Sequence, residues 1–256
     1  YSSYLGGTGD DEARAVTTDS AGNIYLTGAT ASADFPVTNG SSLQGCLSGP
    51  CSDVFITKLN PSRAVVFSTY LGSSGDVSVE SGQGIVLDGS GNIYVTGNTA
   101  YIGSGASFPE TVIVDLPCTL TAGYAFVSRL DASGNLNYST CMGGGHTSEG
   151  KGIAVDSNGY IYVTGYTTSI PTTGQASAPF PTTTNALKTS ASAPDTYDGF
   201  FFVLDPTLGS QGLLYSTYLG GTNRDEGHAI ALDDLGHAYI TGVMFSSDFP
   251  LSANAY

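Results

Sequence analysis

The sequence predicts an all-β protein: a β-propeller built of four blade repeats of up to four antiparallel strands each, with the last blade incomplete within this chain. Two observations support this prediction. Several short motifs recur four times in the same order, and the composition combines 35 Gly with only 11% charged residues, which favours short strands and tight turns over helices. We expect a single propeller domain over residues 1–256, with repeat units at about 1–66, 67–137, 138–214 and 215–256.

The most regular motif is a phrase that joins a turn to a strand. It occurs at Asp19–Gly28, Asp88–Gly97, Asp156–Gly165 and Asp233–Gly242. Every copy begins with Asp-x-x-Gly and continues into a predicted strand that contains Tyr and Thr. Asp accepts hydrogen bonds from the turn backbone, and Gly adopts positive φ without steric cost. The motif therefore predicts a β-hairpin.

The other motifs supply the remaining strands of each unit. An inner strand is expected just before the hairpin, a second strand in its Ile-Tyr-Val-Thr run, a third in a Phe-rich run and an outer one in Tyr-Ser-Thr-Tyr-Leu. The inner strands run through Ala15–Val16, Gly84–Ile85, Gly152–Ile153 and Ala229–Ile230; the third strands, present three times, are Asp53–Leu59, Tyr124–Leu130 and Asp198–Leu204; the outer strands are Tyr1–Leu5, Phe67–Leu71, Tyr138–Met142 and Tyr215–Leu219; and Phe-Pro begins at Phe35, Phe108, Phe180 and Phe249.

These units resemble the bacterial β-propeller repeat called SBBP. The resemblance covers nearly the whole chain, and it rests on Tyr215-Ser-Thr-Tyr-Leu-Gly-Gly, Asp88-Gly-Ser-Gly-Asn-Ile-Tyr-Val-Thr-Gly97 and the Phe-Pro and Phe-rich runs in fixed order. Loop inserts after Phe-Pro, the cysteines and the incomplete fourth unit depart from the pattern. The family is mostly secreted or attached to the bacterial surface and has no shared catalytic activity, so the resemblance implies a scaffold.

The fourth unit lacks a third strand, which leaves a sheet edge to complete. Tyr1–Leu5 can return as the outer strand of a four-bladed ring, with the gap filled by sequence outside this segment or by a strand from a neighbouring copy. A neighbouring copy would build head-to-tail polymers, because a heterologous contact that does not close continues as a fibre. The alternative is direct pairing of Tyr1–Leu5 with Tyr239–Gly242 in a self-sufficient monomer.

The four cysteines predict disulfides. Cys46 and Cys51 bracket a short polar turn, so we expect them to be joined. Cys118 precedes one strand and Cys141 lies on the next, which is compatible with a second bridge or with two buried thiols. The spacings lack the paired cysteines of a zinc site. Disulfides favour an extracellular or cell-surface location.

Three acid–base pairs stand at the entry to the inner strands. Residues two apart in a strand share one face, so Glu12 with Arg14, Glu149 with Lys151 and Glu226 with His228 form either local structural ion pairs or a ring that binds an ion or small polar ligand. The second unit has Ser81 and Gln83 at these positions, and the joint loss of acid and base favours structural ion pairs.

The sequence predicts no enzyme and no cofactor. The acidic turns at Gly9–Glu12 and Asn223–Glu226 offer oxygen ligands for calcium but lack a full ligand loop, so solvated acidic turns are the preferred interpretation. No Gly-x-Ser-x-Gly motif supports a catalytic triad. The repeated tyrosines are expected to pack between blades, with sugar stacking as the alternative.

Charge and composition limit the partners. A formal charge of −15 repels nucleic acid and anionic lipid headgroups, and no run of 18 apolar residues indicates membrane insertion. We expect an extracellular or cell-surface structural or interaction propeller that associates with copies of itself or other surface proteins, with filament or matrix-layer formation through the incomplete blade. The alternative is a module that binds carbohydrate or another surface polymer through the loops after Phe-Pro.

Overall fold

The computed structural model describes residues 2–38, 51–73, 78–101, 107–114, 118, 123–144, 146–168, 179–191 and 196–252. These residues form fourteen β-strands and one short 3-10 helix, η1 (Gly209–Gln211). No helix in this part of the chain is long and apolar enough to cross a membrane. The all-β prediction is therefore confirmed.

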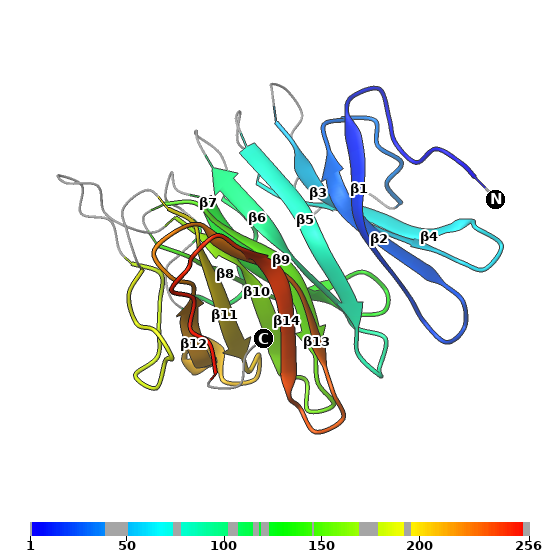
Figure 1. The fold of residues 1–256 in the computed structure, drawn as a ribbon. Coiled ribbons are helices and arrows are strands. Elements are labelled where there is room, and N and C mark those ends of the chain that lie inside the picture. The colour runs from blue at the N-terminus through cyan, green and yellow to red at the C-terminus, as the bar shows by residue number, and fades with distance from the viewer. Residues whose placement is uncertain are drawn as a thin grey trace.

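The strands are arranged as three complete blades and one partial blade, all antiparallel (Figure 1). Blade A contains β1 (Asp11–Thr18), β2 (Ile24–Thr30), β3 (Asp53–Leu59) and β4 (Val65–Leu71); blade B contains β5 (Ser78–Leu87), β6 (Ile93–Tyr101), β7 (Gly123–Leu130) and β8 (Leu136–Met142); blade C contains β9 (Ser148–Val155), β10 (Ile161–Thr167), β11 (Asp198–Leu204) and β12 (Leu213–Leu219); blade D contains β13 (Asp225–Leu232) and β14 (Ala238–Met244). Each complete blade therefore takes its outer strand from the start of the next sequence repeat.

The blades form an open array. The inner strands β1, β5, β9 and β13 follow one another in space, and β1 and β13 lie at different ends of the array (Figure 1). Blade A is therefore separated from blade D by blades B and C. The core lies between neighbouring blades, where Tyr25, Ile56 and Ile85 join blades A and B, and Tyr94, Ile153 and others join blades B and C.

The two expectations for Tyr1–Leu5 are wrong for the residues described. Ser2–Leu5 form no strand, and β14 pairs with β13 alone among the described strands. Leu5 instead packs against Phe35, Phe55 and Tyr70 of blade A. The chain is held near blade A because the backbone N–H of Gly7 donates to Asp11 Oδ2 at 2.8 Å.

The Asp-x-x-Gly hairpins are confirmed. In the first, the Asp19 carboxylate accepts hydrogen bonds from the backbone N–H groups of Ala21 and Asn23 and from the Tyr25 hydroxyl. Gly22 has φ of 80°, the left-handed conformation that favours Gly. The same pattern of contacts is centred on Asp88, Asp156 and Asp233, so each turn is held from within.

Interblade packing of the repeated tyrosines depends on whether another blade follows in the array. Tyr25 and Tyr94 are each 1% exposed, whereas Tyr239 of blade D is 59% exposed. The prediction is correct for blades A and B, where another complete blade covers the ring. In blade D no described strand covers the ring of Tyr239.

A β-bulge interrupts each inner strand at the same position. The register with the second strand skips one residue, and the skipped residues are Arg14, Gln83, Lys151 and His228. A bulge leaves one residue unpaired and redirects its side chain. The basic members of the predicted ion pairs are therefore the bulged residues.

Neighbouring blades approach closely where a Thr of one second strand meets a Gly of the next inner strand. A Cβ added to Gly82, Gly150 or Gly227 would lie within 2.2 Å of the Oγ1 atom of Thr27, Thr96 or Thr164, respectively. Each hydroxyl is also fixed, because it donates to the backbone oxygen of the third-strand Phe at 2.7–2.8 Å. Blade A has Ala13 at the position of these glycines.

We predict that Gly150→Ala destabilises the protein by about 1–3 kcal/mol, because the new methyl group must displace the Thr96 hydroxyl from a packed junction. Equilibrium urea unfolding measures the change. Gly89→Ala is the matched control, because no atom lies within 4 Å of its added Cβ. Equal stability of the two variants would contradict the prediction.

Candidate functional site at the rim of the blades

The rim is the end of the array where the inner strands begin, the second strands end and the third strands begin. In three blades a buried or half-buried acid lies at or near the start of the inner strand, where it accepts a hydrogen bond from the backbone of the preceding loop. The bonds join Gly7 N to Asp11 at 2.8 Å, Ser73 N to Glu80 at 2.9 Å and Gly221 N to Asp225 at 2.7 Å. Blade C has Ser148 at this position, hydrogen-bonded to Thr167.

Two junctions between blades bring a second carboxylate to this acid. At the A–B junction, Asp53 and Glu80 both border Gly72: an added Cβ there would lie 2.2 Å from an oxygen of each carboxylate. At the C–D junction, Asp198 and Asp225 border Gly220 in the same way, at 3.0 and 2.8 Å. Two neighbouring carboxylates repel one another when both are ionised, so each junction must compensate the charge.

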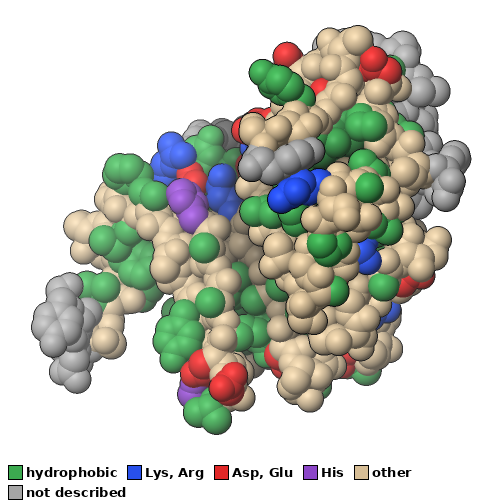
Figure 2. Space-filling view, turned by 90° about the vertical axis from the view of Figure 1, so that its right-hand side faces the viewer, with side chains coloured by type: hydrophobic (Ala, Val, Ile, Leu, Met, Phe, Trp, Pro, Cys, Tyr) green, Lys and Arg blue, Asp and Glu red, His purple; other side chains and the backbone are tan. Residues whose placement is uncertain are grey.

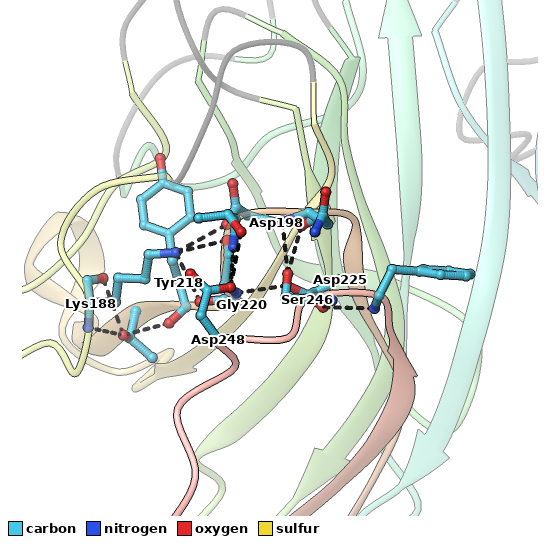
Figure 3. Close-up of polar contacts among 12 residues, drawn as sticks. Lys188, Asp198, Tyr218, Gly220, Asp225, Ser246 and Asp248 are labelled. Atoms are coloured by element: carbon cyan, nitrogen blue, oxygen red, sulfur yellow. Dashed lines mark hydrogen bonds and ion pairs between the residues drawn. The ribbon is translucent and has the colours of Figure 1, made fainter.

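At the C–D junction, a Lys side chain compensates the negative charge of the two carboxylates (Figure 3). Lys188 Nζ lies 3.3 Å from Asp198 Oδ1 and donates to the backbone oxygen of Gly220 at 2.9 Å. Asp225 accepts hydrogen bonds from Ser246 Oγ and from the backbone N–H of Gly221. This network fixes the segment that leads from β12 into β13.

At the A–B junction, protonation of Glu80 reduces the repulsion between the two carboxylates. The Glu80 side chain is buried, and this burial, together with the charge of Asp53, raises the pKa of Glu80 to about 8 despite hydrogen bonds from Ser73 and Thr99. A pKa of about 8 favours the protonated form of Glu80 at pH 7.

The acid–base pairs predicted at the inner strands are in contact. Arg14 lies 2.8 Å from Glu12, Lys151 lies 3.7 Å from Glu149, and His228 lies 3.0 Å from Glu226. Figure 2 shows a His side chain among basic and acidic side chains on this part of the surface.

Sequence reasoning missed Arg224 as a partner of Glu226. Arg224 Nε donates to Glu226 Oε1 at 2.7 Å. Burial opposes ionisation of Glu226, but hydrogen bonds from His228 and Arg224 and the charge of Arg224 outweigh it, so the pKa of Glu226 is lowered. The alternation Arg224, Glu226, His228 was the available signal, because these side chains stand two residues apart at the start of a strand.

Two tyrosines complete a polar and aromatic cluster between blades C and D. The ring centroids of Tyr166 and Tyr197 lie 4.8 Å apart. Lys151 Nζ lies over the Tyr166 ring at 5.3 Å, and the Arg224 guanidinium lies over the Tyr197 ring at 4.7 Å. Tyr166 also donates to Glu149 Oε2 at 2.8 Å. Burial, with the bond to and charge of Glu149, raises the pKa of Tyr166, so its hydroxyl stays protonated.

Cys118 and Cys141 form a disulfide with Cα atoms 5.7 Å apart, which decides between the two alternatives left open by the sequence. Glu110 accepts a hydrogen bond from the backbone N–H of Cys118 at 2.9 Å. These three are the one trio of metal-ligating side chains within the described ranges, and both sulfurs are already bonded. Cys46 lies outside the described residues, so the Cys46–Cys51 bridge stays a prediction.

The acidic turns considered for calcium use their oxygens within the protein. Both oxygens of Asp11 accept hydrogen bonds, one from Thr30 and the other from Ser32 and the backbone of Gly7. Asp225, in the second turn, is held in the same way by Ser246 and Gly221. These contacts explain why acids begin the inner strands without reference to a metal.

A comparison with models of protein families identifies the repeat from which these blades are built. The family model of the SBBP β-propeller repeat matches residues 1–36, 66–100, 137–170 and 214–243, more than half of the chain. The chain belongs to this family. The last three matches begin within an outer strand, every match covers an inner strand, the hairpin turn and all or most of a second strand, and the third strands lie outside the matches. No curated protein matches the chain.

The SBBP repeats therefore account for the strands that recur, while the rim chemistry differs from blade to blade. The matched segments include the acids at the starts of the inner strands, but Lys188, Asp198 and Tyr197 lie between matches.

We predict that stability falls as pH rises from about 5 to 8, because native Glu80 keeps its proton while the unfolded chain releases it near the usual pKa of about 4.3. One such group contributes a slope of about 1.4 kcal/mol per pH unit, which ends above pH 8, when both states are ionised. Glu80→Gln should remove this component of the slope. Urea unfolding at several pH values measures it, with Glu12→Gln as the exposed control. An unchanged slope in Glu80→Gln would show that Glu80 ionises normally.

Proposed function

We propose that this chain is an extracellular or cell-surface propeller module with a structural or interaction role, and that it associates with copies of itself or other surface proteins through blade D. The proposal assigns it no enzymatic activity and no cofactor. One observation carries it: within the described residues, blade D has two strands, whereas blades A, B and C have four strands each. The Cys118–Cys141 disulfide supports an oxidising location.

Blade D exposes both polar backbone and apolar side chains. The edge of β14 opposite β13 has no partner strand among the described residues, and such an edge accepts strands from other chains. Tyr239, Met244 and Phe245 are more than half exposed, and Val243 is 39% exposed. Apolar groups beside an open edge are typical of an interaction surface. Self-association here would continue as a filament or layer if the contact is heterologous.

We predict that the protein self-associates with increasing concentration and that Val243→Lys weakens this association at least tenfold, because a charge beside an open edge opposes strand addition. Light scattering on a concentration series measures the mass, and negative-stain microscopy shows the form. Leu235→Lys is the control, because Leu235 is 83% exposed on a hairpin turn. Monodisperse wild-type monomers at high concentration would refute self-assembly.

A second candidate function is binding of carbohydrate or another surface polymer, favoured by the cluster at the C–D junction. Tyr166 and Tyr197 present aromatic rings beside Lys151, Arg224 and Glu226. Aromatic surface flanked by hydrogen-bonding groups suits a sugar ring, which has apolar faces and hydroxyl edges. Tyr197 immediately precedes β11, at the end of the loop that follows Phe180-Pro181.

We predict that, if this second function operates, a glycan array retains the wild-type protein and Tyr197→Ala lowers retention at least tenfold, because the stacking ring is lost. Tyr160→Ala, on a hairpin turn at the opposite end of the blade, should bind normally. Absence of any retained glycan, or equal retention of both variants, would contradict carbohydrate binding at this cluster.

A further inference from the structure

Blade D carries a preformed slot along the open edge of β14. This slot is a groove of about 380 Å³ lined by Leu219 of β12, Ile240, Thr241 and Gly242 of β14, and Phe249. Two of its lining residues, Gly242 and Phe249, are the counterparts of residues that contact the third-strand Phe in blades A, B and C. Those blades therefore show which kind of segment occupies the equivalent space.

The complete blades place one Phe at a constant position in this space. Phe55 pairs with Gly28, Phe126 with Gly97, and Phe200 with Gly165. The rings of Phe126 and Phe200 come so close that a Cβ on the paired Gly would lie 2.9 or 2.8 Å away. Gly242 is the equivalent residue of β14, and it lines the slot.

A second aromatic ring covers that Phe in every complete blade. The rings of Phe35 and Phe55 lie 4.8 Å apart, those of Phe108 and Phe126 also 4.8 Å, and those of Phe180 and Phe200 4.6 Å. Phe35, Phe108 and Phe180 are at most 2% exposed. Their counterpart Phe249 is only partly buried and lines the groove.

The loop that holds Phe249 already has the conformation seen beside Phe35. Thr8 N donates to Asp34 and Gly9 N to Ser32 at 2.8 Å each, and in blade D Thr222 N donates to Asp248 and Asn223 N to Ser246 at the same distances. The aromatic wall of the slot is therefore positioned without a third strand.

The slot also has a polar group in register. Thr27, Thr96 and Thr164 each donate from Oγ1 to the backbone oxygen of the third-strand Phe. Thr241 stands at the equivalent position beside Gly242. A strand that placed its Phe over Gly242 would present its backbone oxygen to this hydroxyl.

We propose that this slot binds one extended polypeptide strand, antiparallel to β14, that inserts a Phe between Gly242 and Phe249. The partner has the chemistry of the third strands of the chain, Phe-x-x-x-Leu, as in Phe55–Leu59, Phe126–Leu130 and Phe200–Leu204. Backbone hydrogen bonds to β14 give affinity, and the Phe pocket gives specificity. This inference rests on the proposed function and names the strand that blade D recognises.

The test is titration of the full chain, at a concentration where light scattering shows monomers, with a fluorescently labelled peptide of the sequence Asp53–Leu59 flanked by lysines. We expect saturable binding that weakens at least tenfold when Ser replaces the Phe of the peptide, since buried aromatic anchors dominate such contacts. Phe249→Ala in the protein should weaken binding similarly, whereas Leu235→Ala should not. Amide hydrogen exchange should show new protection in Ala238–Met244.

Lack of saturable binding, equal binding of the Phe and Ser peptides, or protection confined to other strands would each overturn the proposal. Thr241→Val provides a second variant that keeps the shape of the side chain and removes its hydroxyl, and weaker peptide binding is expected. Self-association is measured separately from peptide binding. If the protein binds the peptide but stays monomeric, the slot is supported and self-assembly is refuted. If the protein assembles but does not bind the peptide, assembly uses another surface.

Discussion

The close contact between a Thr hydroxyl and a Gly backbone determines how neighbouring blades stack. At each junction, Thr27, Thr96 or Thr164 reaches across to the next inner strand while bonding to the third strand of its own blade. One hydroxyl thus links three strands in two blades. The spacing that it sets allows apolar side chains such as Tyr25 and Ile85 to pack between the sheets, and this packing supplies the core.

The sequence predicted the local structure well because its signals are local. Asp19 and Gly22 determine a turn within four residues, and each predicted strand lies in a short motif that recurs from unit to unit. The placement of Ser2–Leu5 was predicted wrongly, because the motif specifies an outer strand but not which sheet is within reach. Leu5 instead contacts Phe35 and Phe55 of blade A, the blade that directly follows it in the chain.

The rim could be predicted only in part. Glu149 and Lys151 were found because they alternate within one strand. Lys188 and Asp198, in contrast, meet Asp225 from a different repeat and a different loop, so their proximity arises only from stacking. The protonation of Glu80 has the same origin, since it depends on burial and on Asp53 across the blade junction.

Ala13 gives the two ends of the array different surfaces. The three inner strands that receive a neighbouring blade have Gly where blade A has Ala13. If blade D of one copy stacked against blade A of another, the hydroxyl of Thr241 would meet this methyl group. Thr241 could then not take the position that Thr27, Thr96 and Thr164 have at the internal junctions. A stack of identical copies would thus contain a weaker joint at each boundary, and mechanical load would open it there first.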